Sequence, residues 1–189
     1  MDYPANMRRS SGVAVVATLT ALIVGSDFAL AGALDVKLLD AVVFMAALVF
    51  GLRIGAAVGI LSETIWSFVS PWGAAGMMTP FLVLGELLFA VAGWAAARTW
   101  GNNVRQMSSK ALFIGATMAI CAFVWDFETN AATALFEFWP HLTLNEFVYT
   151  EVLQGGPFFL SHDLSDLLLG VFFIPLVIPL VQKVYGAKP

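Results

Sequence analysis

Long apolar stretches dominate this chain and limit the folds open to it. A helix of about 20 residues crosses the apolar part of a bilayer, and tilted or buried helices vary around that length. With 60% hydrophobic and 12% charged residues over 189 positions, the chain is far more apolar than a soluble domain. We therefore predict an all-α membrane protein, one domain over 1–189 with six transmembrane helices. The stretches run at about 12–34, 37–52, 54–70, 78–98, 111–137 and 162–184.

The first stretch follows Arg8 and Arg9 and so resembles a signal peptide. It is long for one and lacks a clear small-residue cleavage site, so we expect it to be retained as a helix. The second and third stretches are short and joined by Gly51-Leu52-Arg53, which predicts a tight hairpin.

The positions of Lys and Arg predict the orientation. Six crossings leave Lys37 alone on one side, and the positive-inside rule makes the other, basic side cytoplasmic. Both termini are then expected in the cytoplasm, with the chain in the plasma membrane. The outer side receives a loop at 70–78 and a longer external loop at 138–161, a candidate lid. The basic side carries Arg8, Arg9, Arg53, Arg98, Arg105, Lys110, Lys183 and Lys188.

Eight acidic side chains lie within or at the mouth of the apolar stretches, all toward the predicted outer side. A carboxylate at bilayer depth costs at least ~2.5–3.5 kcal/mol on insertion scales, so retained acids indicate a function. Interhelical packing is the alternative for any single acid, but it gives no reason for the acids to lie on one side. The eight are Asp27, Asp40, Glu63, Glu86, Asp126, Glu128, Glu137 and Asp166.

The fifth stretch has a polar helical face. Asp126, Asn130, Thr133 and Glu137 follow an i, i+4, i+7, i+11 pattern and share that face, while Glu128 falls on the other side. We expect this face to border a pocket.

The start of the sixth stretch offers a second pair. His162 and Asp166 are one helical turn apart, but two ligands do not make a metal site, so no metal is predicted. Asp163 is expected to be the N-cap of this helix. Lys37 is expected to pair with Asp40 through i, i+3 spacing.

Two tryptophans accompany the acids at depth. Trp66 follows Glu63 by about one turn and Trp125 adjoins Asp126, and indole faces with carboxylates suit a flat or cationic ligand. Asp40, Glu128 and Glu137 are assigned to the rim or to packing. The predicted substrate-binding residues are Glu63, Trp66, Glu86, Trp125, Asp126, Asn130, His162 and Asp166.

Small residues form two further helical faces. The first stretch places Ala17, Ala21 and Gly25 four residues apart, and the hairpin continues with Gly51-x-x-x-Gly55-x-x-x-Gly59. Such faces allow close approach of helices in lipid. For the first stretch, internal packing and docking of a partner both remain open, while the glycine face is expected to pack internally.

Several absences narrow the function. The chain has no P-loop, no H-E-x-x-H and no G-x-S-x-G, so no catalytic motif is visible, ATP hydrolysis by the P-loop route is excluded and no cofactor is predicted. The single Cys121 excludes an internal disulfide. No basic stretch suits nucleic acid.

Three segments carry a family resemblance. The run from Leu34-Asp35 through Phe50-Gly51-Leu52-Arg53-Ile54-Gly55-Ala56-Ala57-Val58-Gly59, with Pro80 to Ala97, resembles the S components of energy-coupling-factor (ECF) transporters. The Trp125-Asp126-Phe127-Glu128-Thr129-Asn130 segment is also similar to that family.

The resemblance implies a substrate-binding subunit that captures a vitamin or related micronutrient from outside. It would dock on a transmembrane coupling subunit driven by two ATP-binding subunits, with Ala17 and Ala21 on the docking face. Acids outnumber bases in the outer half, which favours a cationic ligand such as thiamine. The alternatives are an intramembrane enzyme acting on a lipid or isoprenoid through Asp126, His162 and Asp166, and a self-contained proton- or ion-coupled carrier.

Overall fold

Helices account for all the regular structure that the computed structural model describes, which covers residues 9–33, 35–100 and 109–185. Within these ranges, five helical segments are long and apolar enough to cross a membrane, as judged by length and composition. The chain is therefore an all-α membrane protein, as predicted. The five segments are Ser11–Leu30, Leu52–Val69, Gly76–Thr99, Ala111–Phe138 and Gly156–Val181.

The observed helices follow the predicted stretches closely except in the last third of the chain. A short 3-10 turn η1 (Gly76–Met78) precedes α4, and two π-helical turns, η2 (Thr150–Gln154) and η3 (Leu169–Phe173), lie before and after α8. The α-helices are α1 (Arg9–Leu30), α2 (Leu39–Phe50), α3 (Leu52–Val69), α4 (Thr79–Trp100), α6 (Ala111–Phe138), α7 (Leu144–Tyr149), α8 (Gly156–Leu168) and α9 (Ile174–Tyr185).

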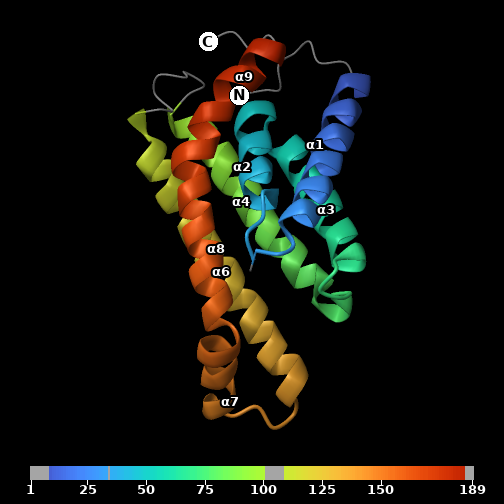
Figure 1. Cartoon of the computed structure of the whole chain (residues 1–189), viewed down its shortest axis with the longest axis vertical. Helices are drawn as coiled ribbons and strands as arrows, with labels where there is room; N and C mark the ends of the chain where they lie inside the picture. The colour runs from blue at the N-terminus through green and yellow to red at the C-terminus, as the bar shows by residue number, and fades with distance from the viewer. Residues whose placement is uncertain (1–8, 34, 101–108, 186–189) are drawn as a thin grey trace.

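The short helix α2 forms the centre of the bundle (Figure 1). Every residue of α2 except Val49 is buried, as expected for a helix that is apolar on all sides. Gly55 of α3 faces Ala47, and Gly93 of α4 faces the carbonyl oxygen of Phe44, so a Cβ atom at either glycine would overlap α2. The hairpin glycines therefore pack internally, as predicted, and hold three helices close together.

The helices α6 and α8 form a long hairpin that extends beyond the rest of the bundle (Figure 1). The segment 138–161, predicted as an external loop, is mostly helical and forms α7, η2 and the first turns of α8, and its external position stays a prediction. Thr143 and Glu146 form a capping box that starts α7. Pro157 lies in the first turn of α8, where proline is well tolerated. The predicted N-cap role of Asp163 is also wrong, because α8 begins at Gly156.

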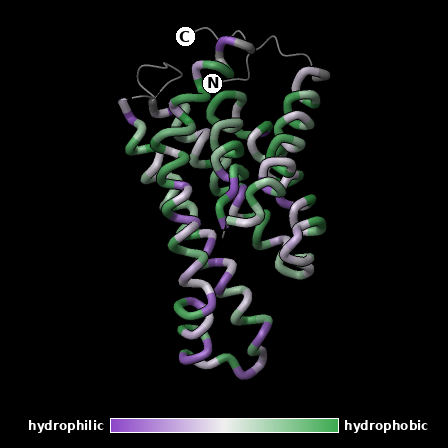
Figure 2. The backbone as a smooth tube through the Cα atoms, in the orientation of Figure 1, coloured by the Kyte–Doolittle hydropathy of each residue, from purple (hydrophilic) through white to green (hydrophobic). Residues whose placement is uncertain are grey.

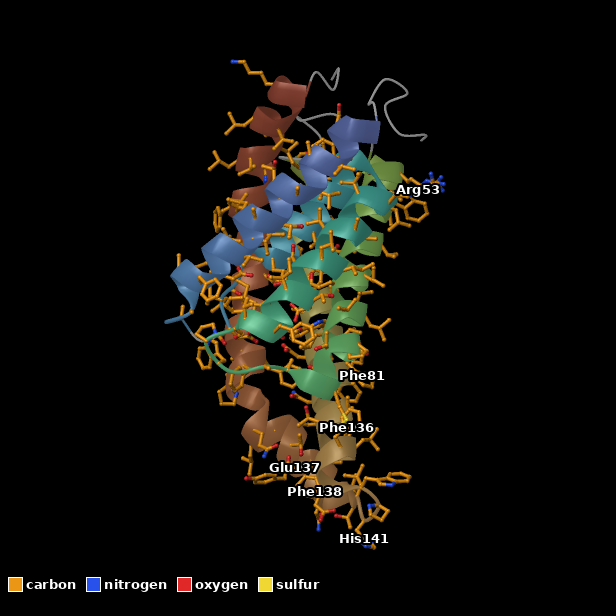
Figure 3. The ribbon with its side chains drawn as sticks, turned by 90° about the vertical axis from the view of Figure 1, so that its right-hand side faces the viewer. Arg53, Phe81, Phe136, Glu137, Phe138 and His141 are labelled. Carbon is orange, nitrogen blue, oxygen red and sulfur yellow. The ribbon has the colours of Figure 1, made fainter. Side chains whose placement is uncertain are left out.

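The two ends of the molecule differ in character. The start of α1 and the end of α9 lie at the same end (Figure 1). Arg53 lies toward that end, whereas Glu137, Phe138 and His141 lie at the other (Figure 3). The half that contains the start of α1 and the end of α9 is largely apolar. Hydrophilic residues gather in the middle and along the α6–α8 hairpin (Figure 2). The candidate site lies in this polar middle.

Candidate functional site

The segment between α1 and α2 brings charge into the bundle. Asp35 has a φ of 50°, a left-handed conformation that aspartate tolerates better than most residues. The Lys37 ammonium pairs with the Asp35 carboxylate at 2.8 Å, and both side chains are largely buried. The predicted pairing of Lys37 with Asp40 is wrong because Lys37 precedes α2, so helical i, i+3 spacing does not apply. Asp27 Oδ1 accepts a hydrogen bond from the Leu38 amide at 3.1 Å and so ties α1 to this segment.

His162 of α8 lies at the centre of a carboxylate cluster. Its Nδ1 is 3.1 Å from Asp126 Oδ2 and 3.9 Å from Asp35 Oδ2. Its Nε2 is 3.4 Å from Asp40 Oδ2 and 3.9 Å from Asp166 Oδ2. We call these five residues the histidine cluster. One imidazole thus links α2, α6, α8 and the α1–α2 segment.

Trp125 forms a wall of the histidine cluster. Its Nε1 donates to the Leu82 carbonyl of α4 at 3.0 Å, and its ring meets the His162 ring edge-on with centroids 5.1 Å apart. The Lys37 ammonium lies 5.1 Å from the centre of the same ring, a cation–π distance. Gly85 of α4 leaves room for the indole, since a Cβ there would overlap it.

Two further buried acids lie beside the cluster. Glu63 of α3 accepts a hydrogen bond from Ser67 Oγ at 3.1 Å. The Glu86 carboxyl group of α4 is in hydrogen-bonding contact with Asp40, and its Cβ lies against Gly59. Glu63, Glu86 and Asp40 are each at most 2% exposed. The rim position predicted for Asp40 is therefore wrong, because α2 carries it into the centre of the bundle.

The charges of Asp35 and Lys37 stabilise each other. Burial by itself raises the pKa of Asp35, but attraction to the Lys37 ammonium outweighs it, so the Asp35 pKa lies below its ordinary value. Burial by itself lowers the pKa of Lys37, but attraction from Asp35, Glu63 and Asp40 outweighs it and raises the Lys37 pKa. Both groups are charged at neutral pH.

A cavity adjoins the histidine cluster. Its volume is about 300 Å³, at the small end for ligand pockets, and it lies between the α1–α2 segment, the end of α3 and the start of α8. Its lining includes Asp27, Asp35, Lys37, Trp66 and Trp72. Since Asp35 lines the cavity and also contacts His162, a ligand in the cavity is one side chain away from His162.

Most of the predicted substrate-binding residues meet here. Asp126, His162 and Asp166 belong to the histidine cluster, Trp125 and Glu86 border it, and Trp66 lines the cavity. Glu63 is buried among the same helices, with Ser67 as its hydrogen-bond partner.

Two residues of the predicted polar face of α6 turn elsewhere. Asn130 packs against Gly155, a contact outside the cluster. Glu137 is exposed near the outer end of α6. Beyond Asp126, toward the outer end of α6, this face therefore no longer borders the site, because α6 extends past the other helices (Figure 1).

Sequence reasoning missed Asp35 as a site residue and placed Lys37 in a simple helical pair. The signal that could have found them is the Asp35-x-Lys37-x-x-Asp40 pattern at a junction between apolar stretches. Opposite charges there indicate a pair that the fold must bury or expose together.

The small-residue face of α1 lies on the surface. Ala17, Ala21 and Gly25 are exposed, and a Cβ at Gly25 would meet nothing within 4 Å. An apolar groove of about 580 Å³ runs between α1 and α3 and includes Ala17 and Ile54 in its lining. Internal packing thus leaves this part of α1 uncovered.

No protein-family model, curated protein or solved structure matches the chain.

Proposed function

We propose that this protein is the membrane-embedded substrate-binding subunit of an ECF-type importer that captures a small cationic micronutrient. The observation that carries the proposal is the cavity lined by Asp27 and Asp35, which joins a buried cluster of carboxylates. Buried acids in a membrane protein mark ligand or ion sites, because their burial is costly without a function.

The proposed topology has six crossings with both termini in the cytoplasm of a plasma-membrane protein. An even number of crossings agrees with α1 starting and α9 ending at the same end of the bundle (Figure 1). The proposed sixth crossing is α2, an apolar helix of 12 residues. Arg53 near that end fits the positive-inside rule (Figure 3).

The proposed ligand is cationic and carries a ring, as thiamine does. Asp27 and Asp35 in the cavity wall outnumber Lys37, and the indoles of Trp66 and Trp72 offer faces for stacking. A cation–π contact contributes about 0.5–2 kcal/mol, more when the site is dry. The volume of about 300 Å³ limits the ligand to a small molecule.

The proposed partners are a transmembrane coupling subunit and two ATP-binding subunits. The exposed Ala17, Ala21 and Gly25 support docking on α1, since small side chains allow close helix approach. This subunit is then non-catalytic, and ATP hydrolysis takes place in its partners.

The ligand proposal is tested by binding to purified protein in detergent. We expect thiamine to bind in calorimetry, and Asp27→Asn or Trp66→Ala to weaken it at least about tenfold, since each removes one cavity contact. The matched control is Glu137→Gln, which removes an exposed acid and should leave the affinity for thiamine unchanged. Mass spectrometry of co-purifying small molecules identifies the native ligand. Binding of anionic vitamins alone would contradict the charge argument.

The docking proposal is tested separately. The double substitution Ala17→Leu and Ala21→Leu should abolish co-purification with a coupling subunit and its ATPases while ligand affinity stays unchanged. Ala116→Leu, at an exposed alanine of α6, is the control and should retain the partners.

A self-contained proton-coupled carrier is the second candidate. His162 bridges Asp126 and Asp40 on two different helices, an arrangement that can relay a proton. Uptake by proteoliposomes that contain this protein alone, driven by a pH gradient without ATP, would favour the carrier over the ECF proposal.

A further inference from the structure

The hydrogen bond at His162 Nδ1 fixes what its other nitrogen can do. A neutral imidazole that donates from Nδ1 to Asp126 Oδ2, 3.1 Å away, keeps an unprotonated Nε2 with a free lone pair. That lone pair faces Asp40 Oδ2 at 3.4 Å and Asp166 Oδ2 at 3.9 Å. Three acceptors therefore converge at one point in the bundle.

Asp166 has no hydrogen-bond partner to compensate for its burial. It is 0% exposed, and neither of its carboxylate oxygens has a hydrogen-bond partner among the described residues. An unsatisfied buried carboxylate is among the most costly groups a protein can contain. Asp166 points toward Nε2 of His162 from the same face of α8, one turn later. The cost indicates that a cation belongs between these groups.

We propose that Asp40, His162 and Asp166 bind a divalent first-row transition-metal ion. The three ligand atoms lie within 4.8 Å of one another. Zinc-type ions bind nitrogen and carboxylate oxygen at about 2.0–2.2 Å, which places two ligands at a tetrahedral angle about 3.4 Å apart. The 3.4 Å and 3.9 Å separations around Nε2 match this value with sub-ångström shifts of the side chains.

The surrounding residues orient the three ligands. Metal-binding histidines commonly donate their second ring N–H to a carboxylate, and Asp126 accepts that bond here. Asp40 is in hydrogen-bonding contact with the Glu86 carboxyl group. Asp126 and Glu86 are therefore positioning residues rather than ligands.

Charge and ligand type narrow the class of ion. Two carboxylates and a neutral imidazole carry a charge of −2, which a divalent cation neutralises in a site that water does not reach. An imidazole ligand favours zinc, copper, iron or nickel over calcium and magnesium, which prefer oxygen ligands alone.

The other side of the imidazole is already occupied. Asp35, near Nδ1, pairs with the Lys37 ammonium at 2.8 Å, and Nδ1 itself faces Asp126 at 3.1 Å. A positive charge is thus already present there. The metal ion belongs on the Nε2 side, where Asp40 and Asp166 supply two carboxylate acceptors.

The metal proposal does not depend on the transport proposal. Its ligands are buried and do not line the cavity, and its test uses neither an organic ligand nor a partner subunit. Failure to bind thiamine or a coupling subunit would leave it standing, and failure to bind metal would leave the transport proposal standing.

The experiment titrates tag-free, EDTA-treated full-length protein in detergent with Co²⁺. We expect about one equivalent to bind, with visible d–d absorption bands of a nitrogen- and oxygen-ligated ion, and Zn²⁺ to displace it. His162→Gln and Asp166→Asn should abolish the bands. Asp126→Asn should weaken Co²⁺ affinity roughly 10–100-fold and retain the stoichiometry, because it orients a ligand.

The matched control is Asp163→Asn, which removes a carboxylate from the same helix next to His162 and should leave Co²⁺ binding unchanged. Size-exclusion profiles report whether each variant folds, and the bands of the wild-type protein test the proposal even if a variant does not. Absence of these bands in wild-type protein would overturn the proposal and leave His162 as an imidazolium bonded to both neighbours. Equal loss in Asp163→Asn would overturn the assigned ligands.

Discussion

At the scale of single residues, the polar centre depends on matching each buried charge with a partner. Asp35 and Lys37 illustrate this, since their side chains are only 12% and 17% exposed. Burial of either charge alone is unfavourable. The pair persists because the attraction between the two charges outweighs the cost of burial, and this attraction lowers the Asp35 pKa and raises the Lys37 pKa. Removing one partner should therefore cost more than removing both.

We predict that Lys37→Met destabilises the protein by on the order of 3 kcal/mol, because it leaves the Asp35 carboxylate buried without its cation. The double variant Asp35→Asn/Lys37→Met should recover part of this loss. Thermal unfolding in detergent measures both effects. A loss of stability in the double variant that equals or exceeds the sum of the losses in the two single variants would contradict the pairing.

The pH dependence of this pair follows from its pKa shifts. The pKa of Asp35 is lowered, so its stabilisation is full above the ordinary value of 3.8 and is lost as pH falls through the lower folded value. The pKa of Lys37 is raised, so its contribution is full below 10.5 and is lost only at higher pH. The difference in melting temperature between wild type and Lys37→Met should therefore be constant from about pH 7 to about pH 9. It should shrink in acid, because the buried Asp35 carboxyl of the variant, without its cation, takes up a proton there.

At the scale of elements, glycines set how closely the helices approach. Gly115 of α6 and Gly170 of η3 face each other, and a Cβ at Gly170 would come within 2.5 Å of Gly115 Cα. The π-helical turn at Leu169–Phe173 lies at this crossing. The contact joins η3 to α6, about one helical turn after Asp166.

We predict that Gly115→Ala destabilises the protein by about 1–3 kcal/mol through overpacking. Its Cβ would lie 2.6 Å from the Leu167 carbonyl oxygen, a backbone atom that cannot move aside easily. The matched control is Gly25→Ala in α1, where nothing lies within 4 Å, and alanine should be neutral or slightly stabilising. Melting temperatures in detergent measure the difference, and equal melting temperatures for the two variants would refute it.

At the scale of the whole molecule, the apolar half and the polar hairpin predict how the protein lies in the membrane (Figure 2). The proposed orientation can be checked with single cysteines in a Cys121→Ala background. In intact cells, Leu144→Cys should react with a membrane-impermeant maleimide, since Leu144 is 76% exposed beyond α6. Lys183→Cys should react only after permeabilisation. Labelling of Lys183→Cys in intact cells would contradict the proposed orientation and indicate the opposite one.

Local patterns in the sequence determined the helices. Apolar length alone predicted α1, α2, α3, α4 and α6 to within a few residues, because a helix in lipid must satisfy its own backbone hydrogen bonds. The region after Phe138 was predicted wrongly. Polar residues and glycines there indicated a loop, but a capping box and Pro157 start helices in that same composition.

The sequence also determined which residue types the site contains. Acids at bilayer depth are costly, so Asp126, His162 and Asp166 could be selected without a structure. Only the tertiary structure decided which of them meet. Asp40 lies at the centre and not at the predicted rim, because α2 is buried on all sides. Asn130 lies outside the histidine cluster, because α6 extends past its neighbours (Figure 1). Helical spacing fixes contacts within one helix, whereas contacts between helices depend on depth and rotation, which glycine packing sets.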